Sequence, residues 1–366
     1  MRILFLNSIG KKKWGGGEKW MLMAAAGLAR NGHQVFIGCA KNSIIRKNAE
    51  ALALPILNIS FNSDFDLPGF IRLLSILKKY QITHLVCGQN KDSKIGAIAA
   101  RCTGGVAVLA RHGLQLISKK FKYKYIFSHL VDGIITNSAS IKQTYDAYGW
   151  FKSDFVKVIH NGFTPPQNVL PFDYKKQFNL PNDAIIIISA GRLAQQKGLN
   201  ILLKTAEMAS QDQKNWFFFI AGKGKLENKL KQMTATKKLT DKVRFLGFIE
   251  NVLPYVQGAD LFVLPSFYEG MPNAVMEAMG LGKCCVVTSV NGNNELIDNE
   301  KEGILVQPHD ARALYNGICQ VAENAAARQL MGKNALAKMR NSFSEDKMIN
   351  ELEAFLKRKS KYENNN

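Results

Sequence analysis

Short apolar runs alternate with amphipathic stretches along the chain, and each run has the length of a buried β-strand. Six such runs lie at residues 2–8, 34–40, 83–88, 106–111, 132–138 and 155–161. Between the first two, residues 18–30 have helical periodicity and precede Asn31-Gly32, a pair that closes helices. Strands that are apolar throughout and separated by helices predict a parallel sheet covered on both faces.

The pattern restarts after a proline-containing segment, residues 164–171. A second series of apolar runs follows at residues 184–192, 216–224, 242–248, 259–266, 284–289 and 303–308. A chain of 366 residues has room for two hydrophobic cores. We therefore expect an α/β protein of two doubly wound domains facing each other across a cleft, with ligands outside the carboxyl ends of the strands.

Composition favours an ordinary globular protein, with 46% hydrophobic and 10% aromatic residues. The five-residue apolar run near the N-terminus is too short for a secretory signal and predicts a buried strand. No apolar stretch reaches the roughly 18 residues of a membrane span. The six cysteines form no CxxC pair and lie among apolar residues, so we expect buried free thiols, no metal site and a cytoplasmic protein.

The formal charge of +20 is concentrated in the first half of the chain. Residues 1–165 carry 23 Lys and Arg against 8 Asp and Glu, a net +15. Such a field attracts phosphate groups of lipids, lipid-linked sugars or nucleic acid, without choosing among them. In the segment 118–125, SKKFKYKY, Lys119, Lys120, Lys122 and Lys124 interleave with aromatic residues. This segment predicts either an acceptor-binding or membrane-binding surface or a solvated helix face.

The segment 267–283, FYEGMPNAVMEAMGLGK, follows the run that ends in LFVLPS. Pro272 is suited to the first turn of a helix, which predicts Glu269 and Gly270 in a loop and Glu277 within the helix. Free N–H groups at the start of that helix would face a phosphate or another anion. Taken alone, the E-x7-E spacing is common by chance and favours two surface glutamates in an ordinary βα unit.

Other strand ends in the second half also carry polar ligand-type residues. Arg192 and Lys197 follow the first run of this half, where a bidentate fork and a point charge would form a diphosphate clamp. Lys223 and Phe248 end the next two runs. Two solvated surface charges are the alternative interpretation for Arg192 and Lys197.

Two features in the first half point to the same cleft. The loop KKKWGGGEKW after the first strand contains Gly15, Gly16 and Gly17, which allow a charged ligand to approach the backbone closely. It matches neither a Walker loop nor a GxGxxG motif, and a flexible basic loop is the alternative. His112 ends the run VAVLA-Arg111 and precedes Gly113, in position for polar contact in the cleft.

The combination of these segments resembles glycosyltransferase family 4, which has the two-domain GT-B architecture. The resemblance extends over nearly the whole chain and rests on GGGE, ARHG, DGIITNS, VIHNGF, AGRLAQQKG, IAGKGKLENKL, VRFLGF, the E-x7-E segment, NELI and GILVQPHD. GRL-x3-KG followed by E-x7-E is the most specific part. The resemblance implies Rossmann-like domains at 1–165 for the acceptor and 166–342 for the nucleotide sugar. It also implies that residues 343–366 form a helix crossing back to the first domain and a polar tail.

The family resemblance implies a retaining, metal-independent transfer of a sugar from a nucleotide sugar, a UDP-sugar in preference, to a hydroxyl of a glycan or lipid-linked acceptor. From the basic charge of the first half and the segment 118–125, we expect peripheral attachment at the inner face of the cytoplasmic membrane. The resemblance places the protein in bacterial cell-surface polysaccharide or lipopolysaccharide biosynthesis, with no cofactor. The residues that it makes catalytic are His112, Arg192, Lys197 and Glu269. The donor-binding residues are Gly15, Gly16, Gly17, Arg192, Lys197, Lys223, Phe248, Gly270, Met271, Pro272, Asn273 and Glu277.

Within that set the resemblance distinguishes roles. Arg192 and Lys197 would bind the donor diphosphate, Glu269 the sugar and Glu277 the ribose, while His112 would contact the sugar. The segment NGNNELI has asparagines where relatives often have glycine and a small residue, which leaves fine donor specificity open. Two alternatives are a sugar-nucleotide epimerase of the same architecture and a basic nucleic-acid-binding protein. The second is suggested by charge alone and lacks a nucleic-acid-binding motif, so no nucleic-acid partner is expected.

Overall fold

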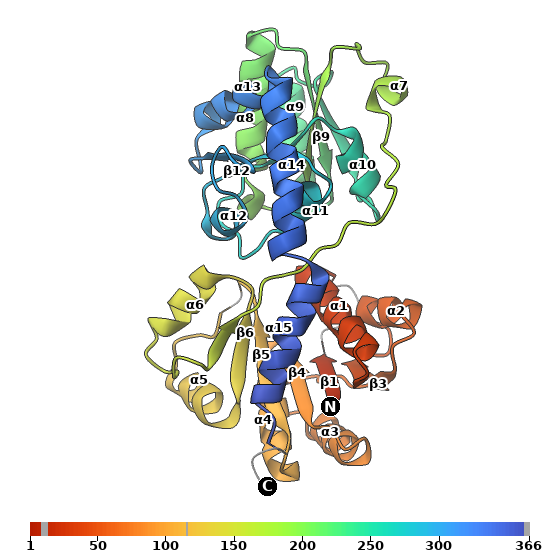
Figure 1. The fold of residues 1–366 in the computed structure, drawn as a ribbon, viewed down its shortest axis with the longest axis vertical. Coiled ribbons are helices and arrows are strands. Elements are labelled where there is room, and N and C mark those ends of the chain that lie inside the picture. The colour runs from red at the N-terminus through yellow and green to blue at the C-terminus, as the bar shows by residue number, and fades with distance from the viewer. Residues whose placement is uncertain (9–13, 115, 362–366) are drawn as a thin grey trace. The chain divides into compact units, whose positions relative to one another are not determined.

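A computed structural model describes residues 1–8, 14–114 and 116–361 of the chain. The chain forms two compact units (Figure 1). The first comprises Met1–Gly162 and the C-terminal segment from Glu345, and the second comprises Phe163–Ser344. Each unit is an α/β structure with one parallel sheet.

The first unit contains a seven-stranded sheet with the order β3-β2-β1-β4-β5-β6-β7. Its strands are β1 Arg2–Asn7, β2 Gln34–Cys39, β3 Ile56–Asn58, β4 His84–Cys87, β5 Ala107–His112, β6 Gly133–Thr136 and β7 Val156–Val158. All six runs predicted in this half are confirmed as strands. The edge strand β3 was not predicted, because its three residues are half-buried or exposed and form no apolar run.

Helices cover both faces of this sheet. One face packs against α1 Gly16–Arg30, α2 Ile44–Ala51 and α15 Glu345–Arg358. The other packs against α3 Leu67–Lys79, α4 Asn90–Thr103, α6 Ala139–Asp146 and the π-helical turn η1 Ile126–Leu130, which continues the short helix α5 Phe121–Tyr125. Alternate residues of β1 enter opposite cores, which explains why the strand is apolar throughout.

The C-terminal helix α15 packs against α1 in this unit (Figure 1). The contact is close at Gly27 of α1, where a Cβ atom would lie 2.1 Å from Cδ1 of Ile349. Nε2 of His84 lies 3.0 Å from the carbonyl oxygen of Leu356, which ties the end of the helix to β4. The helix begins at Glu345, two residues after the predicted start at Phe343, because Phe343 is the C-cap of α14.

The second unit repeats the plan with six parallel strands in the order β10-β9-β8-β11-β12-β13. The strands are β8 Ile185–Ala190, β9 Trp216–Ala221, β10 Val243–Gly247, β11 Leu261–Leu264, β12 Cys284–Thr288 and β13 Gly303–Val306, which confirms all six runs predicted in this half. One face packs against α8 Leu199–Gln211, α9 Glu227–Thr236 and α13 Ala311–Ala322. The other packs against α7 Tyr174–Phe178, α10 Leu253–Gly258, α11 Asn273–Gly280, α12 Asn291–Leu296 and α14 Ala325–Ser342.

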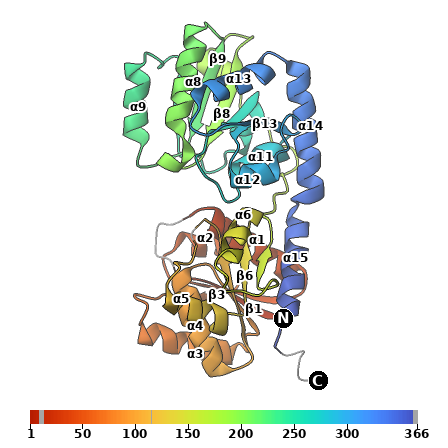
Figure 2. The ribbon, with the colours of Figure 1, turned by 90° about the vertical axis from the view of Figure 1, so that its left-hand side faces the viewer.

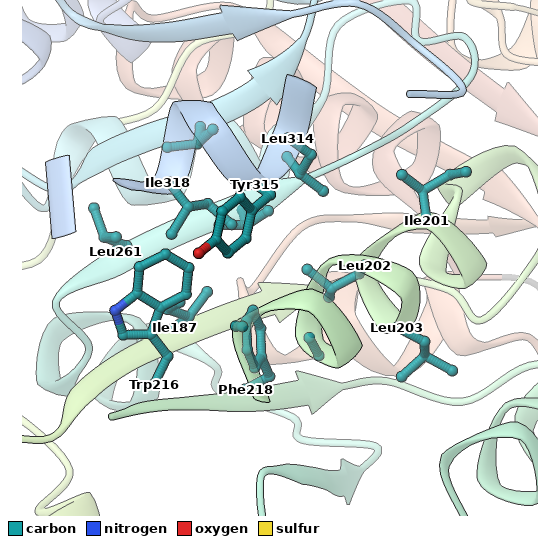
Figure 3. Close-up of a cluster of buried hydrophobic side chains, with 14 of the residues drawn as sticks. Ile187, Ile201, Leu202, Leu203, Trp216, Phe218, Leu261, Leu314, Tyr315 and Ile318 are labelled. Atoms are coloured by element: carbon teal, nitrogen blue, oxygen red, sulfur yellow. The ribbon is translucent and has the colours of Figure 1, made fainter. Parts of the chain in front are cut away.

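The core between the second sheet and its α8 and α13 face is rich in large side chains. Figure 2 shows α8 and α14 on opposite sides of this sheet, and Figure 3 shows the side chains on the α8 side. Trp216 of β9 and Tyr315 of α13 lie with ring centroids 5.6 Å apart, and Ile187 of β8 belongs to the same cluster. This packing fixes the strands whose carboxyl ends carry the site residues.

The cysteines are all free, and four of them are buried as predicted. Cys102 is exposed and Cys319 is half-buried, so the prediction of uniformly buried thiols was wrong for these two. Cys102 lies in the last turn of α4, and Cys319 lies near the end of α13, where it packs partly against the core.

Candidate active site

Each sheet reverses its strand order once, between β1 and β4 in the first unit and between β8 and β11 in the second. Loops that leave two such neighbouring strands go to opposite faces of the sheet, which makes this point the usual ligand site. Gly15, Gly16 and Gly17 follow β1, while Arg192 and Lys197 follow β8. The residues from Glu269 to Glu277 follow β11. These predicted site residues therefore lie at the switch point of their own sheet.

Lys197 and Glu269 form an ion pair across the switch point of the second sheet. Nζ of Lys197 lies 2.5 Å from Oε1 of Glu269, and the two side chains are 16% and 6% exposed. The hydroxyl of Ser266 donates to the same oxygen at 2.6 Å, and the side-chain amide of Gln196 donates to Oε2 at 3.4 Å. The sequence predicted separate ligand contacts for the two charged residues and did not predict that they pair with each other.

Close backbone contact between the turn after β8 and the loop after β11 brings Lys197 and Glu269 together. A 3-10 turn, η2 Gln195–Lys197, ends at Gly198, whose φ of 61° lies in the left-handed region. A Cβ atom at Gly198 would lie 1.9 Å from the carbonyl oxygen of Pro265. The N–H of Phe267 also donates to the carbonyl of Gln196 at 2.8 Å. The turn and the loop after β11 are thus in direct backbone contact, which only glycine at position 198 permits.

Three further predicted donor residues lie at the same edge of the second sheet. Arg192 is exposed, and within the described part of the chain its guanidinium has no hydrogen bond or ion pair. It lines a small pocket together with Gly191 and Lys197. Lys223, after β9, is exposed, and Phe248, after β10, is 64% exposed. An exposed cation and an exposed aromatic ring are free to contact an anionic, ring-containing ligand.

The E-x7-E segment divides as predicted, with Glu269 in the loop and Glu277 within α11. Pro272 is the N-cap residue of α11, with φ −79° and ψ 107°, so its predicted place in the first helical turn was one residue off. Both positions suit proline, since neither needs its N–H. The start of α12 supports the loop from behind, because a Cβ atom at Gly292 would lie 2.1 Å from the carbonyl oxygen of Gly270.

In the first unit, His112 is the buried last residue of β5. Its Nδ1 lies 2.8 Å from the hydroxyl of Tyr145, and its ring packs between Tyr145 and Phe127. Burial, with a smaller effect of the neighbouring Arg111, lowers the pKa of His112 to about 3, so the imidazole is neutral at physiological pH. Its Nε2 is buried and has no partner among the described residues.

Arg111 was not predicted as a site residue, although it lies in the ARHG motif. Its guanidinium stacks over the ring of Trp20 at 4.8 Å and donates to Oδ1 of Asn161 at 3.2 Å. Burial lowers the pKa of Arg111 to about 10, partly opposed by the nearby carboxylate of Glu18. The side chain therefore stays charged at neutral pH, and Glu18, itself buried, is its counter-charge. In the sequence, Arg111 and Glu18 are single charged residues beside glycines, and nothing in that pattern predicts that they pair.

The glycines after β1 are not required by packing at two of the three positions. A Cβ atom at Gly15 would lie 3.5 Å from Oε2 of Glu18, and one at Gly17 would lie 3.6 Å from Nη1 of Arg111, both ordinary contacts. Gly15 has an extended φ of −165°, which any residue adopts. The predicted basic part of this loop, residues 11–13, lies outside the described residues.

A buried carboxylate holds the start of the same loop. The N–H of Ser8 donates to Oδ2 of Asp92 at 3.0 Å, and the Ser8 hydroxyl donates to the other oxygen. Burial raises the pKa of Asp92 to about 6. Asp92 lies in the first turn of α4, the helix that follows β4, so it connects the two strands of the switch point.

The lysines predicted for an acceptor or membrane surface are all exposed: Lys119, Lys120, Lys122 and Lys124. Phe121 is 83% exposed among them. Lys94 links this segment to the loop before α3, because it pairs with Asp64 and lies 5.6 Å from the ring centroid of Tyr123. That neighbouring loop and α3 expose Phe65, Leu67 and Ile71. We call these exposed residues on α3, α5 and their flanking loops the basic apolar face.

The described residues contain neither a metal-binding cluster nor a membrane-spanning helix. Residues 1–8, 14–114 and 116–361 contain no cluster of three His, Cys, Asp or Glu side chains that could hold a metal ion. Within the same ranges, every helix is too short or too polar to pass through a lipid bilayer.

Comparison with known proteins matches both halves of the chain. The family described as "Glycosyltransferase Family 4" matches residues 14–165, and "Glycosyl transferases group 1" matches residues 172–338. The UDP-Gal:alpha-D-GlcNAc-diphosphoundecaprenol alpha-1,3-galactosyltransferase of Escherichia coli is 29% identical over 325 residues, 83% of each chain. The lipopolysaccharide core biosynthesis glycosyltransferase LpsD of Rhizobium meliloti is 27% identical over 197 residues, which cover 54% of this chain and 55% of LpsD.

Among solved structures, HepE of Anabaena in complex with UDP and glucose has a TM-score of 0.84. It is 20% identical and covers 98% of this chain and 100% of its own, which supports a common GT-B fold. Two Rossmann-like parallel sheets, the strand-end residues at their switch points and the two family matches lead to one classification. The chain belongs to glycosyltransferase family 4.

Proposed function

We propose that this glycosyltransferase is retaining and metal-independent, and that it transfers a sugar from a UDP-sugar to a hydroxyl of a lipid-linked or glycan acceptor. The pathway would be the synthesis of a bacterial cell-surface polysaccharide or lipopolysaccharide. The Escherichia coli relative supports both substrate classes, since its name combines a UDP-sugar donor with a diphosphoundecaprenol-linked acceptor. The UDP and glucose in the HepE complex support the same donor class.

The observation that carries the proposal is the Lys197–Glu269 pair beside the exposed Arg192. An ammonium group has three N–H donors, and Glu269 uses one of them, so Lys197 keeps donors for a diphosphate. Arg192 adds a bidentate cation with no protein partner among the described residues. Two cations at the leaving phosphate would stabilise the charge that develops there, the role that a metal ion fills in other transferases.

The remaining donor contacts follow from the same edge of the sheet. Glu269, fixed by Ser266 and Gln196, would accept hydrogen bonds from hydroxyls of the transferred sugar. The loop residues Gly270, Met271 and Asn273 would offer backbone N–H groups, and Glu277 would hold the ribose. Lys223 and Phe248 would contact the nucleotide, with Gly15, Gly16 and Gly17 near the diphosphate.

The two halves of the chain would take different substrates. We assign residues 1–165 to the acceptor and 166–342 to the nucleotide sugar, with the helix and tail of 343–366 returning to the first domain. The basic apolar face of the first unit would dock on anionic lipids at the inner face of the cytoplasmic membrane, because lysines attract the headgroups and Phe121 enters the interface.

The test is a transfer assay with a short polyprenyl-diphosphate GlcNAc acceptor and a panel of UDP-, GDP- and TDP-sugars. We expect transfer from a UDP-sugar, unchanged by EDTA, with NMR of the product showing the anomeric configuration of the donor. A bound donor at 100 times its dissociation constant should stabilise the fold by about 2.7 kcal/mol, measured as a thermal shift. Inversion, loss of transfer in EDTA, or nucleotide release without an acceptor would contradict the proposal.

A further inference from the structure

The side chain of Tyr145 bridges two groups that are distant in the sequence. Its hydroxyl lies 3.2 Å from the backbone nitrogen of Ile117 and 2.8 Å from Nδ1 of His112. The backbone N–H has no choice of role and donates to the hydroxyl oxygen. In the contact with His112, the donor is either the phenol O–H of Tyr145 or an N–H at Nδ1 of His112.

The available donors and acceptors determine whether Nδ1 or Nε2 of His112 carries the imidazole proton. If Nδ1 of His112 carried it, the phenolic proton of Tyr145 would have no acceptor and the Nε2 lone pair would also be unmatched. If Tyr145 donates to Nδ1, the phenolic proton and Nδ1 are both satisfied, and only one polar group, Nε2–H, has no partner in the described part of the chain. Unpaired buried groups are costly, so the second arrangement is the stable one.

The surroundings hold Tyr145 in this position. The residue is fully buried in α6, and its ring contacts Tyr148 and Phe151 with centroids 5.5 and 5.9 Å apart. His112 lies on a neighbouring element, the end of β5, with its ring 5.6 Å from that of Phe127. These ring contacts keep the phenol hydroxyl of Tyr145 within hydrogen-bonding distance of Nδ1 of His112.

We propose that Tyr145 is a positioning residue that fixes His112 as the Nε2–H tautomer, so that His112 presents a hydrogen-bond donor to an oxygen of the transferring sugar. This inference rests on the proposed sugar contact of His112. It adds a residue to the site that neither the motifs nor the spacing of charged residues indicated. It also gives His112 a definite chemical role: a neutral donor and not a base.

The chain contains a matched control in Tyr148. The hydroxyl of Tyr148 donates to the carbonyl oxygen of Ile117 at 2.8 Å, so both tyrosines anchor the same residue. Tyr148→Phe removes one anchor of Ile117 and leaves His112 untouched. Tyr145→Phe removes the other anchor and also the donor to Nδ1. Tyr145 anchors the N–H of Ile117 and Tyr148 anchors its carbonyl, so the signals of His112 itself provide the readout that distinguishes the variants.

The first measurement is the ¹H–¹⁵N spectrum of histidine-labelled protein at neutral pH, with the His112 signals assigned from His112→Gln. We expect the wild-type protein and Tyr148→Phe to show one His112 tautomer, protonated at Nε2. In Tyr145→Phe, the Nδ1 resonance should shift as it loses its donor. A wild-type His112 protonated at Nδ1, or an unshifted Nδ1 in Tyr145→Phe, would overturn the inference.

The second measurement is steady-state transfer with the donor and acceptor of the wild-type assay. Tyr145→Phe should lower kcat about tenfold with little change in the donor KM, because one oriented hydrogen bond is lost in the transition state. Tyr148→Phe should retain wild-type kcat, and equal kcat values in the two variants would refute the positioning role. His112→Gln tests the underlying sugar contact separately: undiminished transfer there would contradict the sugar contact of His112, whereas no transfer by the wild type would contradict the proposed function.

Discussion

Nζ of Lys197 lies 2.5 Å from Oε1 of Glu269, although one residue follows β8 and the other follows β11. The pair joins the two loops that leave the sheet in opposite directions, so it holds the switch point together as well as presenting charge to a ligand. Substitutions at either residue should consequently affect stability and transfer in different proportions.

We expect Lys197→Ala to abolish most transfer and also to lower the free energy of unfolding of the second unit by about 3 kcal/mol, because the buried carboxylate of Glu269 loses its counter-charge. The double variant Lys197→Ala/Glu269→Gln should recover most of that stability and none of the activity. Urea denaturation and the transfer assay measure the two effects. Additive losses of stability in the double variant would show that the pair is not coupled.

Arg192→Ala should separate catalysis from folding. Its exposed guanidinium has no partner within the described ranges, so stability should stay within about 0.5 kcal/mol of wild type. The loss of one cation at the leaving phosphate should lower kcat by about 10²- to 10³-fold. Lys229→Ala, which removes an exposed charge on α9, is the control and should leave both quantities unchanged. Wild-type turnover in Arg192→Ala would exclude a role at the diphosphate.

Two glycine substitutions should have different effects, one on donor binding and the other on stability. Gly15→Ala should fold normally, because the added Cβ has room, and should weaken donor binding if the ligand approaches the backbone there. Gly292→Ala should destabilise the second unit, because its Cβ would lie 2.1 Å from the carbonyl oxygen of Gly270. Thermal unfolding with and without the donor distinguishes the two. Normal donor affinity in Gly15→Ala would argue against close approach at this loop.

Stability of the first unit should fall in mild acid. The folded-state pKa values of His84 and His112 are lowered to about 4 and about 3, mainly by burial, whereas the unfolded chain protonates histidine near pH 6.5. Each therefore contributes stability at neutral pH that is lost as pH falls below 6.5, by up to about 1.4 kcal/mol per pH unit. Asp92 has the opposite sign, because its raised pKa, about 6, makes the folded state bind a proton more tightly.

Urea denaturation between pH 7 and pH 5 measures this balance. Two histidines outweigh one aspartate, so the free energy of unfolding should decrease toward pH 5 by roughly the effect of one proton per pH unit. Asp92→Asn should make the decrease steeper, and His84→Gln should make it shallower. A stability that rises on acidification would contradict the assigned protonation states.

The basic apolar face should bind anionic vesicles. Changing Lys119, Lys120, Lys122 and Lys124 together to Gln should weaken sedimentation with phosphatidylglycerol vesicles by more than tenfold, since each lysine near such a surface contributes about 1 kcal/mol. A control with the same charge loss changes the exposed Lys225, Lys229, Lys238 and Lys333 of the second unit to Gln. Equal binding by the two variants, or no preference of the wild type for anionic over neutral vesicles at low salt, would contradict membrane docking.

Most of the fold could be predicted from the sequence because its strands are buried on both faces. Parallel strands of this kind form apolar runs that stand out from amphipathic helices, and twelve strands were found in this way. The strand β3 was not predicted, because none of its three residues is fully buried and they form no apolar run. Pro272 shows the usual uncertainty of one residue at a helix start.

Site residues that directly follow a strand could be predicted from the sequence. Contacts between residues distant in the sequence could not. Arg192, Lys197 and Glu269 each follow an apolar run, so their position on the sheet could be inferred. The Lys197–Glu269 pairing depends on the approach of two backbone loops at Gly198, which no local pattern encodes. Tyr145 lies in an unremarkable helical segment, 33 residues from the histidine that it contacts.

The position of α15 has a consequence for synthesis of the protein on the ribosome. Met348, Ile349, Leu352, Phe355 and Leu356 complete one hydrophobic core of the first unit, although nearly two hundred residues separate them from Gly162. The first unit therefore cannot finish folding as it leaves the ribosome, and the helix α1 stays partly uncovered until α15 has also emerged.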